Sequence, residues 1–186
     1  MTNRVHITGA SGSGVTTLGR ALADAYALPH HDTDDYYWLP TEPPYRAKRE
    51  IPDRLSLMRE LFLPRTGWVL SGSLMGWATE VEACFDIVVF VSTPTPVRLE
   101  RLRKRETLRY GPDAIDDGGS HYDAVRAFLD WAASYDDRAF EGRSRAGHEA
   151  WLQEQACPVM RVDGEQPTYE LVDFIVRQRS ALVPNR

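Results

Sequence analysis

A glycine-rich stretch directly follows the first apolar segment of the chain. It comprises Gly9, Ala10, Ser11, Gly12, Ser13, Gly14, Val15, Thr16 and Thr17. The spacing fits the pattern G-x-x-x-x-G-K-[ST], except that Val15 stands where the pattern has lysine. Glycines in such a turn let successive backbone N–H groups point at phosphate oxygens, and the helix that follows presents its positive end. The stretch therefore predicts a strand, a phosphate-binding turn and a helix.

The same stretch predicts a magnesium ligand and a missing charge. The hydroxyl of Thr16 is placed to bind Mg²⁺ beside a nucleotide polyphosphate. Val15 lacks the ammonium group that would contact the β and γ phosphates. Loss of one preorganised donor costs about 10² to 10³ in rate, against total accelerations of at least about 10⁶. We therefore expect phosphate binding to survive and turnover to be handicapped. The alternative is a glycine-rich turn without a ligand.

Strands and helices are predicted to alternate along the chain. Apolar spacing predicts strands over 4–8, 29–32, 67–71, 85–91 and 158–162, and helices over 17–26, 51–63, 95–105 and 168–179. The segment 85–91 is almost continuously apolar, which is typical of a central strand covered on both faces. Such alternation implies crossover connections and a three-layer α/β domain.

Two segments fit neither pattern, and both are candidates for binding loops. Residues 40–50 contain three prolines and a basic end, and we interpret them as an acceptor-side loop. Residues 106–122 are rich in glycine and aspartate toward their end, and we interpret them as a lid over the phosphates. Trp38 and Tyr45, in or next to the first segment, are candidates for stacking on a base or sugar. Ordinary packing is the alternative for both.

Acidic and histidine side chains follow the second predicted strand. The run is His30, His31, Asp32, Thr33, Asp34 and Asp35. In an extended segment Asp32 and Asp34 share one side, where they could hold Mg²⁺ through water and deprotonate an acceptor hydroxyl. A solvated turn and a transition-metal site are the alternatives. Because the strands at 67–71 and 85–91 do not end in aspartate, Asp32 is the better magnesium candidate.

Three arginines precede the predicted lid at the spacing of one helix face. Arg98, Arg101 and Arg105 follow the pattern i, i+3, i+7. A solvated helix face is one explanation of this spacing. The other is that Arg101 or Arg105 supplies the positive charge missing at Val15, because a guanidinium group suits bidentate contacts to phosphate.

Composition limits the class of protein. The chain has 186 residues, of which 42% are hydrophobic, which suits one domain over 1–186. Its net charge of −5 argues against general nucleic-acid or anionic-membrane binding. We expect Cys84 and Cys157 to be buried free thiols of a reducing compartment. Without a leader or an apolar run of about 20 residues, we expect a cytoplasmic monomer or homodimer.

At these motifs the chain resembles the P-loop kinases of the adenylate kinase and shikimate or gluconate kinase group. The segment 9–16 is similar to their Walker A motif, 32–34 to the D-x-D of shikimate kinases, 71–73 to their third-strand turn, and 101–105 to the R-[LI]-x-x-R entering the lid of nucleotide kinases. The resemblance implies a five-stranded parallel sheet of order 2-3-1-4-5 flanked by helices. The chain departs from the family pattern at Val15, and the segment after Asp34 lacks the arginine expected for shikimate.

The resemblance also implies an activity. The γ-phosphoryl group of ATP would pass to a small acceptor, either a metabolite hydroxyl or a nucleotide. Thr16 would bind Mg²⁺, Asp32 would hold it through water, Asp34 would act on the acceptor hydroxyl, and Arg101 or Arg105 would stabilise transition-state charge. The alternative hypothesis, motivated by Val15, is a nucleotide-binding regulatory or sensor protein with little turnover.

Overall fold

The computed structural model describes residues 2–182, whose strands form a five-stranded parallel sheet. The strands are β1 (Asn3–Gly9), β2 (His30–Asp32), β3 (Gly67–Ser71), β4 (Ile87–Ser92) and β5 (Val159–Asp163). Their order is β2-β3-β1-β4-β5, and all neighbours are parallel. This confirms the predicted fold class and strand order. Parallel pairing brings the carboxyl ends of all five strands to one edge of the sheet, where the glycine-rich turn leaves β1.

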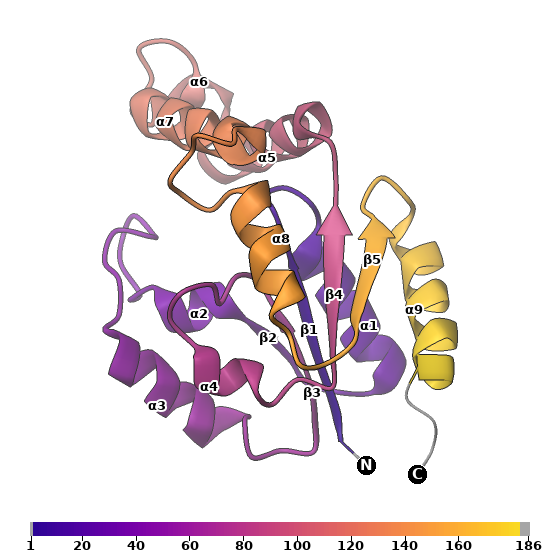
Figure 1. Ribbon diagram of the computed structural model, residues 1–186. Helices are drawn as coiled ribbons and strands as arrows, with labels where there is room; N and C mark the ends of the chain where they lie inside the picture. Colours follow the sequence, from indigo (N-terminus) through magenta and orange to yellow (C-terminus); the bar gives the residue numbers. More distant parts are fainter. Residues whose placement is uncertain (1, 183–186) are drawn as a thin grey trace.

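Helices cover both faces of the sheet and extend beyond this edge (Figure 1). They are α1 (Val15–Tyr26), α2 (Thr33–Tyr37), α3 (Ile51–Leu61), α4 (Thr79–Glu82), α5 (Thr95–Tyr110), α6 (Pro112–Ile115), α7 (Tyr122–Ala133), α8 (Arg145–Gln153) and α9 (Thr168–Leu182), with a 3₁₀ turn, η1, at Ser134–Asp136. Helices α5, α6 and α7 lie together above the carboxyl ends of the strands (Figure 1). No helix in residues 2–182 is long and apolar enough to cross a membrane.

Two apolar clusters hold the layers together, one on each face of the sheet. On the first face α1 and α9 contribute side chains such as Leu18, Leu22 and Ile175. On the other face α2, α3, α4 and α8 contribute side chains such as Met58 and Trp151. Strand β4 supplies Ile87, Val89 and Val91 to the first cluster and Val88 and Phe90 to the second. This explains why its sequence is almost continuously apolar.

The structure corrects several sequence-based boundaries. The segment after β2 is helical from Thr33, because Asp32 caps α2 by accepting a hydrogen bond from the Asp34 backbone N–H at 3.0 Å. Helix α5 continues five residues past the expected end at Arg105 and stops before Gly111, whose φ of 87° lies in the left-handed region. The helices between residues 122 and 153 were not predicted, although α7 is amphipathic and rich in apolar residues.

The two cysteines also differ from expectation. Cys84 and Cys157 are free, as predicted, but both are half-buried rather than buried. Both pack at the margin of the cluster under α3, α4 and α8. Burial raises the pKa of the Cys157 thiol, so the half-buried position favours the neutral thiol over the reactive thiolate.

A buried histidine on β1 should make the fold sensitive to acid. His6 is fully buried and stacks on Phe85 with ring centroids 4.7 Å apart. Burial lowers the pKa of His6 from 6.5 to about 3, and the contact of Nδ1 with the Leu70 carbonyl opposes that shift only in part. As the pH falls below 6.5, the unfolded chain binds the proton first, so folded stability decreases at about 1.4 kcal/mol per pH unit.

We therefore expect His6 to lower the free energy of unfolding by about 2 kcal/mol between pH 7 and pH 5. Urea denaturation at pH 7, 6 and 5 measures this change. His6→Phe keeps an aromatic ring in the stack without a titrating group, and should show a shallower pH dependence. Burial also lowers the pKa of His148 to about 3, so part of the dependence should remain. An unchanged slope in His6→Phe would show that His6 does not stay neutral when folded.

Candidate active site

The turn between β1 and α1 presents backbone rather than side chains at the helix N-terminus. Gly12 and Gly14 have φ values of 82° and 99°, which favour glycine. A Cβ at Gly12 would lie 2.6 Å from the carbonyl oxygen of Arg98, so the turn also packs closely against α5. Gly14 is the N-cap of α1, and no side chain caps the helix. The first N–H groups of α1 are thus left to a ligand such as phosphate.

The two predicted magnesium residues lie together at the start of α1. The Thr16 hydroxyl donates a hydrogen bond of 2.8 Å to Oδ2 of Asp32. Asp32 is positioned by the end of β2, which pairs in parallel with Ser71 of β3. Within residues 2–182, no group of three or more His, Cys, Asp or Glu side chains is arranged to hold a metal ion. The oxygens of Thr16 and Asp32 are hard donors of the kind that Mg²⁺ takes together with water and phosphate.

Asp34 lies near these residues for a different reason from the one predicted. It belongs to α2 rather than to an extended segment, so strand alternation does not set its direction. Asp34 is exposed to solvent, and nearby protein desolvates its carboxyl only in part. This partial desolvation, followed by the charge of Asp32, raises the pKa of Asp34. Arg143, a hydrogen bond from Trp38 and Arg105 oppose the increase. Asp34 is therefore a carboxylate with a raised proton affinity beside positive charge.

The three arginines of α5 have different surroundings despite their shared helix face. Arg98 is fully buried and donates hydrogen bonds of 3.2 Å to the carbonyl oxygens of Ser11 and Ala132. Arg101 donates to the carbonyl oxygens of Ser13, at 3.4 Å, and of Gly164, at 2.9 Å.

Arg105 lies farther along the same face. It is half-exposed and pairs with Glu106 at 2.7 Å. Spacing thus predicted the common face, but not that Arg98 ties the glycine-rich turn to α7.

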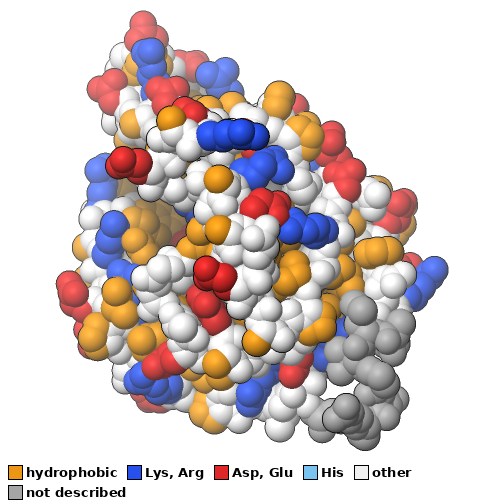
Figure 2. Space-filling view, viewed as in Figure 1, with side chains coloured by type: hydrophobic (Ala, Val, Ile, Leu, Met, Phe, Trp, Pro, Cys, Tyr) orange, Lys and Arg blue, Asp and Glu red, His pale blue; other side chains and the backbone are white. Residues whose placement is uncertain are grey.

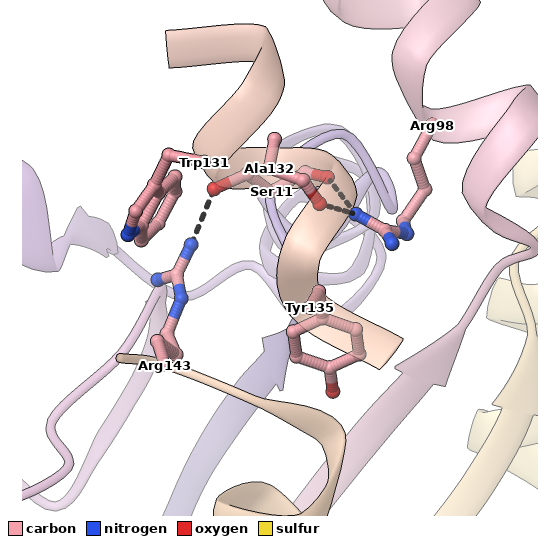
Figure 3. A pocket seen from close by; sticks show the side chains of 6 residues that line it. All are labelled: Ser11, Arg98, Trp131, Ala132, Tyr135 and Arg143. Carbon is pink, nitrogen blue, oxygen red and sulfur yellow. Dashed lines mark hydrogen bonds between the residues drawn. The ribbon is translucent and has the colours of Figure 1, made fainter. Parts of the chain in front are cut away.

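Arg143 is a site residue that sequence reasoning missed. It lies in the connection between η1 and α8, and its Nη2 donates to the Ser11 hydroxyl of the glycine-rich turn. Its guanidinium carbon is 5.3 Å from the ring centre of Trp131 on α7. Figure 3 shows Arg143 and Arg98 on opposite sides of Ser11, with Trp131 beside Arg143. In the sequence, Arg143 is marked only by its position beside Gly142, after the predicted lid. This is a weak signal, because the segment has no apolar periodicity that would predict an element there.

Aromatic rings and a buried arginine pack together beside α2 and the 40–50 segment. Arg54 of α3 is 5% exposed, and its guanidinium lies 3.9 Å from the ring centre of Tyr37 and 5.0 Å from that of Trp77. Trp38 contacts Tyr45 edge-on, with ring centroids 5.8 Å apart.

Figure 2 shows a hollow in the surface of the molecule. In Figure 2 the molecule is hollowed on the left, between α2 and the α6–α7 region, and hydrophobic side chains line the hollow. Arg109 of α5 lies over the ring of Tyr45 at 5.3 Å, so the 40–50 segment touches the end of α5.

Comparison with known sequences places the chain in a family. No protein-family model matches it. It is 43% identical over 176 residues to the uncharacterised protein YqaC of Bacillus subtilis (strain 168), a match that covers 95% of this chain and 97% of YqaC. The chain belongs to the YqaC family. Identity at this level over nearly the whole of both chains implies that this member and YqaC share one fold.

Three solved structures similar to this YqaC-family chain are of small-molecule kinases. A shikimate kinase from Acinetobacter baumannii in complex with shikimate has a TM-score of 0.56 and 15% identity, with 100% of this chain and 97% of that chain covered. A sugar kinase from Janibacter sp. HTCC2649 has a TM-score of 0.54 and 19% identity, with 99% and 97% covered. A gluconokinase from Sinorhizobium meliloti 1021 has a TM-score of 0.51 and 21% identity, with 97% and 89% covered. This chain therefore has the P-loop kinase fold.

Proposed function

We propose that the protein is a phosphotransferase that moves the γ-phosphoryl group of Mg-ATP to a small metabolite hydroxyl or a nucleotide. The observation that carries this proposal is the hydrogen bond between Thr16 and Asp32, which joins an uncapped, glycine-rich helix N-terminus to a carboxylate at the end of β2. Backbone N–H groups and the helix end suit phosphates, and the paired oxygens suit Mg²⁺. A simple glycine-rich turn has no need of that carboxylate.

The chain supplies the groups that such a transfer requires. Thr16 and Asp32 would hold Mg²⁺, which when bound offsets the charge of the β and γ phosphates. Asp34 would accept the proton of the acceptor hydroxyl as its oxygen bonds to the γ phosphorus. The bond from that phosphorus to the β–γ bridging oxygen breaks, and ADP leaves with that oxygen. Arg101 and Arg105 would stabilise the charge of the transferring group from the side of α5.

We further propose that the acceptor carries a negative charge and binds in the hollow beside α2. Arg54 is almost completely buried and its Nε donates to the Arg49 carbonyl at 2.6 Å, yet within residues 2–182 its guanidinium pairs with no carboxylate. A buried guanidinium is costly without an anion. Residues 40–50 would close this acceptor site on one side, and residues 106–122 would act as a lid. The contact of Arg109 with Tyr45 joins the two segments.

A second candidate function is a nucleotide sensor with little turnover, favoured by the position of Val15. Its side chain packs toward the apolar cluster under α1, and Cγ1 lies 3.3 Å from where a Cβ at Gly9 would be. Residue 15 therefore brings no charge to the phosphates. In this case ATP would bind and stabilise the protein without transfer to any acceptor.

An acceptor screen separates the two functions. Purified protein with Mg-ATP would be incubated with a panel of small hydroxyl compounds, each offered in carboxylated, phosphorylated and uncharged forms, and with nucleoside monophosphates. We expect ATP to raise the melting temperature, and ADP release to increase with at least one anionic acceptor. Stabilisation without transfer across the panel favours the sensor. Transfer only to uncharged acceptors contradicts the role of Arg54, and no stabilisation by ATP contradicts both functions.

A further inference from the structure

We propose that Arg143 supplies the positive charge at the γ phosphate that Val15 cannot supply. The charge of the nucleotide site would then come from the connection between η1 and α8 instead of from the first turn of α1. This inference rests on the proposed function, because it requires that the glycine-rich turn bind ATP. The inference goes beyond the proposed function because it assigns a phosphate-contacting role to a residue outside the turn and outside α5.

The guanidinium of Arg143 is already at the turn. Its Nη2 donates to the hydroxyl of Ser11, inside the glycine-rich stretch, and Trp131 holds the group from the side (Figure 3). Its Nε is buried and, among residues 2–182, has no hydrogen-bond partner. A buried N–H without an acceptor costs free energy that a phosphate oxygen would recover. The unpaired donor therefore leaves Arg143 with hydrogen-bonding capacity that an anion at the turn would use.

The electrostatics of Arg143 differ from those of a structural arginine. Burial lowers the pKa of Arg143, and the charge of Asp34 offsets this only in part. Within the described part of the chain, Arg143 forms no ion pair with any carboxylate. Arg98, on the other side of Ser11, instead has an ion pair with Asp136 at 3.5 Å as well as its carbonyl partners. Arg98 is satisfied in the free protein, whereas Arg143 has capacity for a ligand.

The position of Arg143 also suits the group that is transferred. It contacts the glycine-rich turn through Ser11, and the charge of the predicted base, Asp34, acts on its guanidinium. The γ-phosphoryl group must pass from the turn toward that base to reach an acceptor hydroxyl. A planar guanidinium can donate two hydrogen bonds to phosphate oxygens there. The β phosphate, held by the turn itself, depends less on this side chain.

The test compares two nucleotides that differ by the γ phosphate. Isothermal titration with a β,γ-imido ATP analogue and with ADP, both with Mg²⁺, would be carried out on the wild type, Arg143→Gln and the control Arg138→Gln. Arg138 is exposed in the same connection. For Arg143→Gln we expect the Kd of the analogue to rise by roughly 10- to 100-fold and that of ADP by less than about threefold. The control should match the wild type for both nucleotides.

Two further measurements separate a phosphate contact from a structural role. The free Arg143→Gln protein should melt at or above the wild-type temperature, because it loses a buried charge without an acidic partner. The double variant Val15→Lys with Arg143→Gln should recover most of the lost analogue affinity, since lysine returns the charge from the first turn of α1.

Four outcomes would each overturn the role of Arg143. In Arg143→Gln these are a melting temperature below that of the wild type, an equal loss of affinity for both nucleotides, and no loss of affinity for either. In the double variant it is a failure to recover affinity for the analogue. These outcomes leave the proposed function standing, provided that the wild type binds ATP. A wild type that binds neither nucleotide would overturn both.

Discussion

Replacing Asp34 with asparagine should lower the acceptor-dependent rate of ADP release by about 10²- to 10⁴-fold, the usual contribution of a general base. Asparagine keeps the size of the side chain but cannot accept a proton at neutral pH. The affinity for ATP should change little, since we propose that the phosphates bind at the turn after β1, whereas Asp34 belongs to α2. Steady-state kinetics with the acceptor found by screening, and titration with the ATP analogue, measure the two effects.

The raised pKa of Asp34 gives this prediction a second readout. The carboxylate must be ionised to act as a base, so the rate should fall as the pH drops through a value above the ordinary 3.8. The same shift means that the folded chain binds this proton more tightly than the unfolded chain does. Asp34 thus favours folding only at low pH and loses that contribution as the pH rises through its folded pKa. At neutral pH, Asp34→Asn should therefore be at least as stable as the wild type.

Asp35→Asn is the matched control for this experiment. Asp35 is the next residue of α2, and burial raises its pKa too, but the basic side chains that oppose this increase are His30 and Arg20 rather than Arg143. We expect its turnover to stay within about twofold of the wild type. Equal losses in the two variants would mean that charge near α2, rather than proton transfer by Asp34, is what the reaction needs. Unchanged turnover in Asp34→Asn would rule out its role as a base.

The fold could be predicted because its signals are local and repeated. Three local signals each predict one element. They are the apolar run of β4, the glycine stretch after β1 and the amphipathic spacing of α1. The rules for crossover connections between parallel strands, together with the resemblance to P-loop kinases, then leave few possible strand orders. The short helices were harder. Helix α2 begins where the Asp32 side chain caps the chain, and this capping replaces the extended segment suggested by alternating aspartates.

The candidate site was predictable only where its residues lie close to a motif. Thr16 and Asp32 adjoin a glycine turn and a strand end, so their meeting at 2.8 Å follows from the topology. Arg143 and Arg54 come from segments without such a marker, and tertiary packing alone brings them to the site. The helix face of Arg98, Arg101 and Arg105 showed their common direction. It could not show which guanidinium would be buried, because that depends on α7 and η1 packing over it.

Replacing Arg98 with alanine should lower the free energy of unfolding by about 3 to 5 kcal/mol, the range for breaking a buried, hydrogen-bonded charge. The side chain is completely buried and binds the carbonyl oxygens of Ser11, Thr93 and Ala132. Its removal leaves these oxygens without a donor in a space that alanine does not fill. Urea denaturation at pH 7 measures the loss, and an unchanged m-value would show that the denatured state is the same.

Arg103→Ala provides the control for Arg98→Ala, because Arg103 is exposed on the same helix and its loss should cost no more than about 0.5 kcal/mol. The bonds of Arg98 join the glycine-rich turn to α5 and to the end of α7, so the variant should also weaken ADP binding, which Arg143→Gln should not. Equal unfolding free energies for Arg98→Ala and Arg103→Ala would mean that water replaces the lost donors. The turn would then keep its shape through its own glycines and Ser13, whose N–H bonds to the Ala10 carbonyl at 3.1 Å, independently of α5.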